Sequence, residues 1–150
     1  MAKNVYLDYN ATTPVAPEVL EAMSPWFTER FWNAASSHPM GMVANDAVEA
    51  ARRQVADLIG AHPNEIVFTS GSTESINLAL KGALSASSGR TGIVTVATEH
   101  KAVLDTAAWL AEQGASTCVL PVTAFGEIDP ELFAGSVDEH TAVVSVMAAN

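Results

Sequence analysis

Gly92-Ile93-Val94-Thr95-Val96-Ala97 is a short apolar, β-branched run, and the polar turn Thr98-Glu99-His100-Lys101 follows it directly. A run of this kind, bounded by polar residues, is typical of a buried strand. The segment from Lys101 to Gln113 is predicted to be a helix, with Gly114 as its stop. A strand that passes through a short turn into a helix is the repeating unit of a parallel α/β sheet.

The same alternation continues on both sides of this unit. The further segments predicted as strands are Glu65–Thr69, Ser116–Pro121 and Thr141–Met147, and those predicted as helices are Ser72 to about Leu84 and a short acidic stretch after Pro130. Short strands rich in β-branched residues, alternating with helices, predict a largely parallel sheet flanked by helices on both faces. The fold class is therefore α/β.

The first 60 residues follow a different pattern. Loops are expected over residues 9–14 and 33–41, and helices over 17–28 and 42–59. Pro25 should disturb the second half of the first helix, and Gly60 should close the second helix in a C-cap position. We therefore expect residues 1–60 to form an N-terminal loop and helical segment, and residues 61–150 to begin an α/β domain that is incomplete at its C-terminus.

Composition excludes several classes of protein. Hydrophobic residues make up 49% of the 150 residues, which is enough for a folded core. The formal net charge of −10 opposes binding to nucleic acids and to anionic membranes. Cys118 is the only cysteine, so no intrachain disulfide can form, and no Cys/His pair has the spacing of zinc ligands. No apolar run is long enough for a signal peptide or a membrane span, and we expect a cytoplasmic protein.

The turn Thr69-Ser70-Gly71-Ser72-Thr73-Glu74-Ser75 has two interpretations. Ser72 and Thr73 can present backbone N–H groups and hydroxyls to a phosphate at the start of a helix. Alternatively, Ser72 is an ordinary N-cap and Glu74 is favoured by the helix dipole. The turn alone does not decide between these interpretations.

Two histidines allow similar alternatives. His100 follows the strand that ends at Ala97, so it could stack on a ligand or transfer a proton near neutral pH, or it could simply lie half-exposed at a helix start. His38 lies in the loop Asn33–Gly41, which could border a site or be plain surface.

Taken together and in order, several stretches resemble the bacterial cysteine desulfurases of the NifS/IscS kind, in the class V aminotransferase group of fold-type I pyridoxal-phosphate enzymes. The matching stretches are Tyr6–Pro14, Asn33–Gly41, Glu65–Ser75, Thr98–Leu104 and Val144–Asn150. The resemblance covers essentially the whole chain, and it implies that residues 61–150 are the first part of the large domain that binds the cofactor.

The resemblance also implies residue roles. Ser72 and Thr73 match the pair that holds the phosphate of pyridoxal 5'-phosphate, and His100 matches the catalytic histidine that stacks on the ring of the cofactor and assists proton transfer. Asn150 matches the first residue of the family's Asn-Asn-Glu motif, a cofactor-binding position. Asn10, Asn33 and His38 match positions at the rim of the substrate site.

The activity implied is the conversion of L-cysteine to L-alanine, with transfer of the sulfur as a persulfide for iron–sulfur cluster or thio-cofactor synthesis. Family members are homodimers and deliver sulfur to an acceptor or scaffold protein. The family's cofactor-anchoring lysine and sulfur-accepting cysteine have no match here, so we expect an N-terminal part that is inactive alone. The alternatives are a selenocysteine lyase, an aminotransferase of the same group, or a truncated, non-catalytic homologue that acts only in binding.

Overall fold

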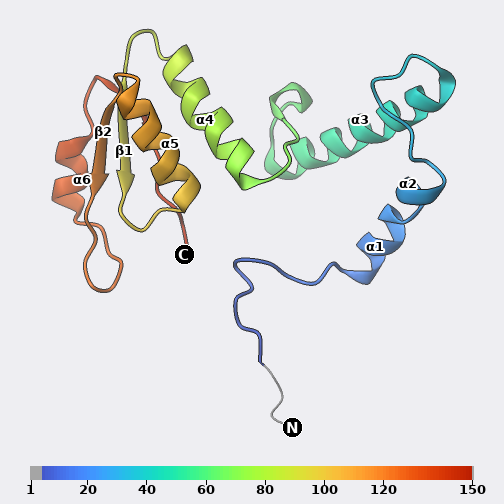
Figure 1. The fold of residues 1–150 in the computed structure, drawn as a ribbon, viewed down its shortest axis with the longest axis horizontal. Helices are drawn as coiled ribbons and strands as arrows, with labels where there is room; N and C mark the ends of the chain where they lie inside the picture. Colours follow the sequence, from blue (N-terminus) through green and yellow to red (C-terminus); the bar gives the residue numbers. More distant parts are fainter. Residues whose placement is uncertain (1–4, 150) are drawn as a thin grey trace. The chain divides into compact units, whose positions relative to one another are not determined.

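The computed structural model describes residues 5–149, which fall into two compact units divided between Phe68 and Thr69 (Figure 1). The described part of the first unit contains helices, and that of the second contains a sheet with helices on both faces. Among the described residues, no helix has both the length and the apolar character needed to cross a membrane.

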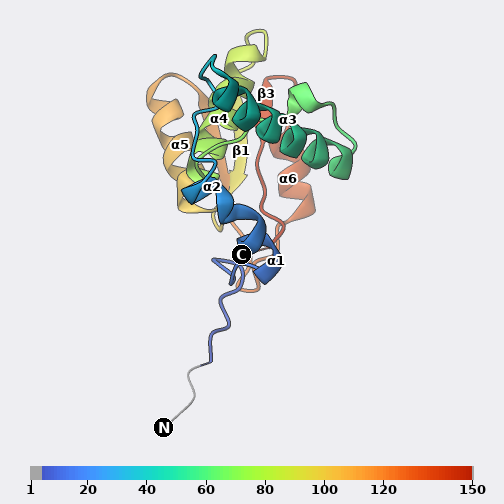
Figure 2. The same cartoon turned by 90° about the vertical axis from the view of Figure 1, so that its right-hand side faces the viewer.

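The second unit contains a parallel three-stranded sheet. Its strands are β1 (Gly92–Val96), β2 (Ser116–Leu120) and β3 (Thr141–Val144), in the order β2-β1-β3. Helices α4 (Ser72–Ala86) and α5 (Lys101–Glu112) pack against one face, and α6 (Pro130–Ser136) packs against the other (Figures 1 and 2). This confirms the predicted α/β class with a parallel sheet flanked by helices.

The core of this unit follows from the alternation along β1. Ile93 is fully buried in a cluster with side chains of α4 and α5, namely Leu80, Val103, Ala107 and Leu110. The next residue, Val94, points to the opposite face with Val96, where they pack with Leu120 and the partly buried Phe133 of α6. Because successive strand residues face opposite sides, one short apolar run supplies both clusters.

The first unit is built from helices. They are α1 (Pro17–Met23), α2 (Pro25–Thr28), α3 (Pro39–Ile59) and the 3-10 turn η1 (Pro63–Glu65). The helix predicted over 17–28 is divided in two because Pro25 has no N–H to donate and begins a new helix at its first position. Helix α3 ends at Ile59, and its C-cap is Gly60, whose φ of 70° is the left-handed conformation that favours glycine.

Helix α3 begins three residues earlier than the sequence pattern predicts. The His38 side chain caps it by accepting a hydrogen bond from the Gly41 N–H at 3.2 Å, and Pro39 occupies the first turn. Gly41 is buried against the preceding loop: a Cβ placed on it would overlap the backbone carbonyl of Ser36, whose carbon would be 2.8 Å away. The loop and the first turn of α3 are therefore packed backbone to backbone.

The strand predicted over Glu65–Thr69 is not formed. Glu65 ends the turn η1, and residues 66–69 pair with no strand of the described chain. The Arg52 guanidinium instead donates a hydrogen bond to the Ile66 carbonyl and lies 5.0 Å from the centroid of the Phe68 ring. The apolar, β-branched composition favours an extended backbone, but a strand also requires a neighbouring strand to supply its hydrogen bonds.

Candidate functional site

The candidate site lies at the edge of the sheet where β1 and β3 end, which we call the carboxyl edge. Helix α4 leads into β1 and α5 follows it, and because each runs in the direction opposite to the strand, both begin at this edge. Figure 1 shows the first turns of α4 and α5 and the segment after β3 at the same end of the second unit. The chain topology thus brings the Ser72–Thr73 turn and His100 to one edge.

The start of α4 has free hydrogen-bond donors. Its N-cap residue is Gly71, with φ 155° and ψ −176°, and no side chain caps the helix. Within the described residues, neither the N–H groups nor the hydroxyls of Ser72 and Thr73 have a protein acceptor. Orphan donors at the positive end of a 15-residue helix fit a phosphate group. The alternative in which Ser72 caps the helix is not what the structure shows.

The turn before α4 is held by its own side chains. The hydroxyl oxygens of Thr69 and Ser75 are 2.6 Å apart, and each lies 3.2 Å from the Gly71 carbonyl oxygen. One carboxylate oxygen of Glu74 accepts from the backbone N–H and from the hydroxyl of Ser70, each at 2.7 Å. These bonds, the backbone one first, lower the pKa of Glu74 below its ordinary value of 4.5. The Glu74 carboxylate is therefore held by its two hydrogen bonds from Ser70.

This bond should be lost in acid. Since the folded-state pKa of Glu74 is depressed, its bonds to Ser70 stabilise the turn above pH 4.5 and disappear as the pH falls through the lowered value. We expect the amide proton shift of Ser70, followed by NMR, to titrate with a midpoint below 4.5, and the Glu74→Gln variant to lack that transition. A midpoint at or above 4.5 would contradict the bonded arrangement.

His100 caps helix α5 and leaves one ring nitrogen for a ligand. Its Nδ1 accepts a hydrogen bond from the Ala102 N–H at 3.0 Å, so the neutral ring carries its proton on Nε2. The side chain is exposed at the carboxyl edge. An imidazole held through one nitrogen, with the other free, can stack on a ring or exchange a proton.

A buried carboxylate, not identified from the sequence, lies beside it. Glu99 is 8% exposed; its Oε1 accepts from the Ser145 hydroxyl at 3.0 Å, and its Oε2 accepts from the His100 N–H at 3.1 Å. A hollow of about 390 Å³ opens at the same edge, and its lining residues are Thr98, Phe125, Gly126, Met147, Ala148 and Ala149.

The remaining predicted residues belong to the first unit or fall outside the description. Asn10 lies in an exposed turn. Asn33 accepts a hydrogen bond from the Ala35 N–H through Oδ1 at 2.9 Å, and His38 is the cap of α3. Asn150 lies outside the described residues. Binding roles for Asn10, Asn33, His38 and Asn150 remain predictions.

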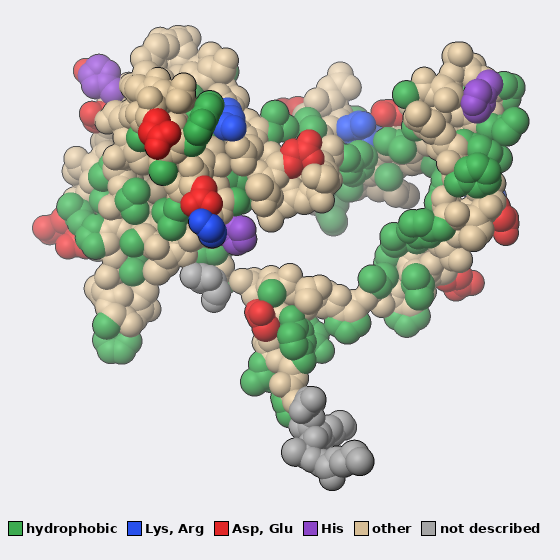
Figure 3. Space-filling model, viewed as in Figure 1, with side chains coloured by type: hydrophobic (Ala, Val, Ile, Leu, Met, Phe, Trp, Pro, Cys, Tyr) green, Lys and Arg blue, Asp and Glu red, His purple; other side chains and the backbone are tan. Residues whose placement is uncertain are grey.

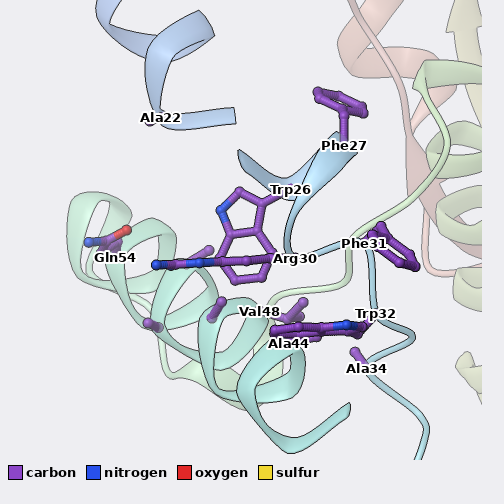
Figure 4. Close-up of a pocket in the computed structure, with 13 residues that line it drawn as sticks. Ala22, Trp26, Phe27, Arg30, Phe31, Trp32, Ala34, Ala44, Val48 and Gln54 are labelled. Atoms are coloured by element: carbon purple, nitrogen blue, oxygen red, sulfur yellow. The ribbon is translucent and has the colours of Figure 1, made fainter. Parts of the chain in front are cut away.

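A hollow in the first unit is lined by none of the predicted residues. It is a groove of about 800 Å³ between α3 and the segment from α2 to Ala34 (Figure 4). Its wall is mostly apolar and aromatic, with the Arg30 guanidinium 5.6 Å from the centroid of the Trp26 ring.

Among the described residues, no group of three His, Cys, Asp or Glu side chains could hold a metal ion.

Comparison with known proteins assigns the chain to a family. The model of the aminotransferase class-V family matches residues 5–150. The cysteine desulfurase IscS of Dechloromonas aromatica is 51% identical over 149 residues, which cover 97% of this chain and 37% of that protein. The mitosomal cysteine desulfurase of Trachipleistophora hominis is 48% identical over 150 residues, covering 97% and 34%. The chain thus spans about a third of the length of these curated relatives.

Solved structures agree with this assignment. A NifS-like protein superposes with a TM-score of 0.89 at 43% identity, over 99% of this chain and 41% of that one. SspA in complex with cysteine gives a TM-score of 0.82 at 38% identity, over 94% and 41%. The resemblance inferred from the motifs is confirmed: the chain belongs to the aminotransferase class-V family, and it is similar to the first part of proteins named as NifS-like proteins and IscS cysteine desulfurases.

Proposed function

We propose that the protein carrying these residues is a pyridoxal-phosphate-dependent cysteine desulfurase, and that this chain forms one wall of its cofactor site. The observation that carries the proposal is the pairing of an uncapped helix N-terminus with an exposed histidine at one carboxyl edge. That pairing occurs in a chain about half identical to enzymes named as cysteine desulfurases.

Each residue at the edge has a proposed task. The N–H groups and hydroxyls of Ser72 and Thr73 hold the phosphate, and the turn bonded through Glu74 keeps them in place. His100 lies against the cofactor and moves a proton through Nε2. Pyridoxal phosphate, when bound, supplies an electron sink for chemistry on an amino acid. Asn150 completes the cofactor contacts, and Asn10, Asn33 and His38 border the substrate.

We propose L-cysteine as the substrate. Its sulfur passes to a thiol of the enzyme as a persulfide, L-alanine is released, and the sulfur goes on to an acceptor or scaffold protein. The likeness to SspA, a protein whose structure is solved in complex with cysteine, supports this substrate class. A homodimer in the cytoplasm is the proposed setting.

Removing the phosphate contacts should weaken cofactor binding. We expect the double variant Ser72→Ala/Thr73→Ala to bind pyridoxal phosphate about 10- to 100-fold more weakly, because two hydrogen bonds to a charged group are lost. The dissociation constant of the full-length protein can be measured from the absorbance of the bound cofactor. Ser85→Ala, on the exposed face of the same helix, is the matched control and should leave it unchanged. If the double variant and the wild type bind pyridoxal phosphate with equal affinity, Ser72 and Thr73 do not contact the phosphate.

The activity itself is tested with the full-length protein and L-cysteine in the presence of a thiol. Stoichiometric L-alanine and sulfide support the proposal. Turnover of L-selenocysteine alone, or amino transfer to a 2-oxo acid, would assign it to another branch of the family.

We further propose that the 150 residues do not turn over cysteine by themselves. Both lysines in the described part are engaged: Lys81 lies 4.3 Å from the centroid of the Trp109 ring, and Lys101 is paired with Asp105 at 2.8 Å. Production of L-alanine from L-cysteine by the isolated 150 residues with pyridoxal phosphate would contradict this proposal.

A further inference from the structure

Glu99 joins two strands at the carboxyl edge. It follows β1, and its Oε1 accepts from the hydroxyl of Ser145, a residue 46 positions further along the chain and just after β3. Ser145 is itself fixed, because its backbone N–H donates to the Val94 carbonyl of β1 at 2.9 Å. Through Ser145, the Glu99 carboxylate is therefore attached to a rigid part of the sheet.

The second carboxylate oxygen of Glu99 bonds to the residue that follows it in the chain. Oε2 of Glu99 accepts from the backbone N–H of His100 at 3.1 Å. The imidazole of His100 is in turn held by Ala102 through Nδ1. A chain of hydrogen bonds thus runs from Ser145, the residue after β3, through Glu99 to the backbone of His100, and the His100 ring is fixed on the first turn of α5.

The burial of the Glu99 side chain indicates that these hydrogen bonds have a structural role. Glu99 is only 8% exposed, and none of the ion pairs in the described part of the chain includes it. A carboxylate removed from water without a cationic partner depends on its hydrogen-bond donors. A glutamate that served only to cap a helix would gain by remaining in solvent, so the buried position indicates a connecting role.

We propose that Glu99 is a positioning residue that sets the place of His100 relative to the end of β3. The proposal rests on the proposed function, in which His100 meets the cofactor. Glu99 touches neither cofactor nor substrate in this role; it acts by fixing the backbone from which the imidazole projects.

The first experiment requires no cofactor. Amide hydrogen exchange at His100 and Ala102 is measured by NMR or mass spectrometry in full-length Glu99→Gln, Ser145→Ala and Ser145→Thr variants. Loss of one hydrogen bond to the carboxylate should speed exchange about tenfold in the first two. Ser145→Thr keeps the hydroxyl and should restore wild-type exchange. Glu139→Gln removes the same charge from a side chain that is 88% exposed and is the matched control.

The second experiment tests the link to His100. In the cofactor-loaded protein, Glu99→Gln should lower kcat about tenfold with little change in KM, and it should shift the absorption spectrum of the bound cofactor as Ser145→Ala does. In a His100→Ala background, Glu99→Gln should have no further effect on kcat, since residues that act as a unit are not additive.

Three results would overturn the inference: unchanged exchange at His100 in both disruptive variants, failure of Ser145→Thr to restore it, or full additivity of Glu99→Gln with His100→Ala. If Glu99→Gln does not fold, the Ser145→Ala and Ser145→Thr pair decides alone. If the wild type binds no pyridoxal phosphate, the proposed function fails, while the exchange measurements still test the hydrogen-bond chain.

Discussion

The His100→Ala variant of the full-length enzyme is expected to lose about 10²- to 10⁴-fold in kcat for L-cysteine, the usual contribution of a positioned acid–base group. The physical reason is that Nδ1 accepts from the Ala102 N–H, which leaves Nε2 as the nitrogen that can exchange a proton with a ligand. The measurement is steady-state alanine production with saturating cofactor.

Because His100 also caps α5, the variant needs two controls. Asparagine is a good N-cap without a titrating group, so His100→Asn should preserve the stability of α5 while losing as much activity as His100→Ala. His62 caps η1 through Nδ1 in the same way, and His62→Ala should cost some stability without lowering kcat. Near-normal turnover by His100→Asn would show that capping, rather than proton transfer, is the task of His100.

The Gly41→Ala variant is expected to lower the free energy of unfolding by about 2–3 kcal/mol, within the range for overpacking. The added Cβ would overlap the Ser36 backbone carbonyl, and backbone cannot move aside as a flexible side chain can. The same displacement would break the bond from the Gly41 N–H to His38. Urea unfolding of the full-length protein measures the change.

Gly82→Ala is the matched control for this prediction. Gly82 also lies inside a helix, α4, but nothing lies within 4 Å of an added Cβ. Alanine there should raise stability by about 0.5–1 kcal/mol through its better helix propensity. Equal effects of the two substitutions would show that the contact between Gly41 and Ser36 is not part of the folded protein.

Most elements could be predicted from the sequence because their signals are local. Helices α4 and α5 and strands β1 and β2 lie within about two residues of their predicted bounds. The errors occur where partners decide the outcome. Residues 66–69 have strand composition, but no described strand pairs with them and Arg52 donates to the Ile66 carbonyl instead. Helix α3 begins early because His38 caps it, a role not assigned to histidine from the pattern alone.

In the candidate site, too, the features with a local sequence signal could be predicted, and those that depend on distant residues could not. The turn before α4 and the histidine after β1 are short motifs at strand ends, so both could be identified by position. The bond from Ser145 to Glu99 joins residues 46 positions apart and exists only once β3 lies beside β1. Nothing in the spacing of the sequence predicts that Glu99 is buried, since glutamate after a strand is ordinarily a solvated residue.

The two units differ in what they bury. Within residues 5–68 only Gly41, Ala44 and Ala56 are buried, while large side chains such as Leu7, Phe31 and Leu58 are 70–84% exposed. Figure 3 shows hydrophobic side chains at the surface along this part of the chain. Residues 69–149 contain the sheet and both hydrophobic clusters. Residues 5–68 bury too few apolar side chains to form a core by themselves, so this segment expressed alone is expected to stay unfolded. A cleavage near residue 68 would therefore release a segment that chaperones bind through its exposed apolar side chains and that proteases degrade.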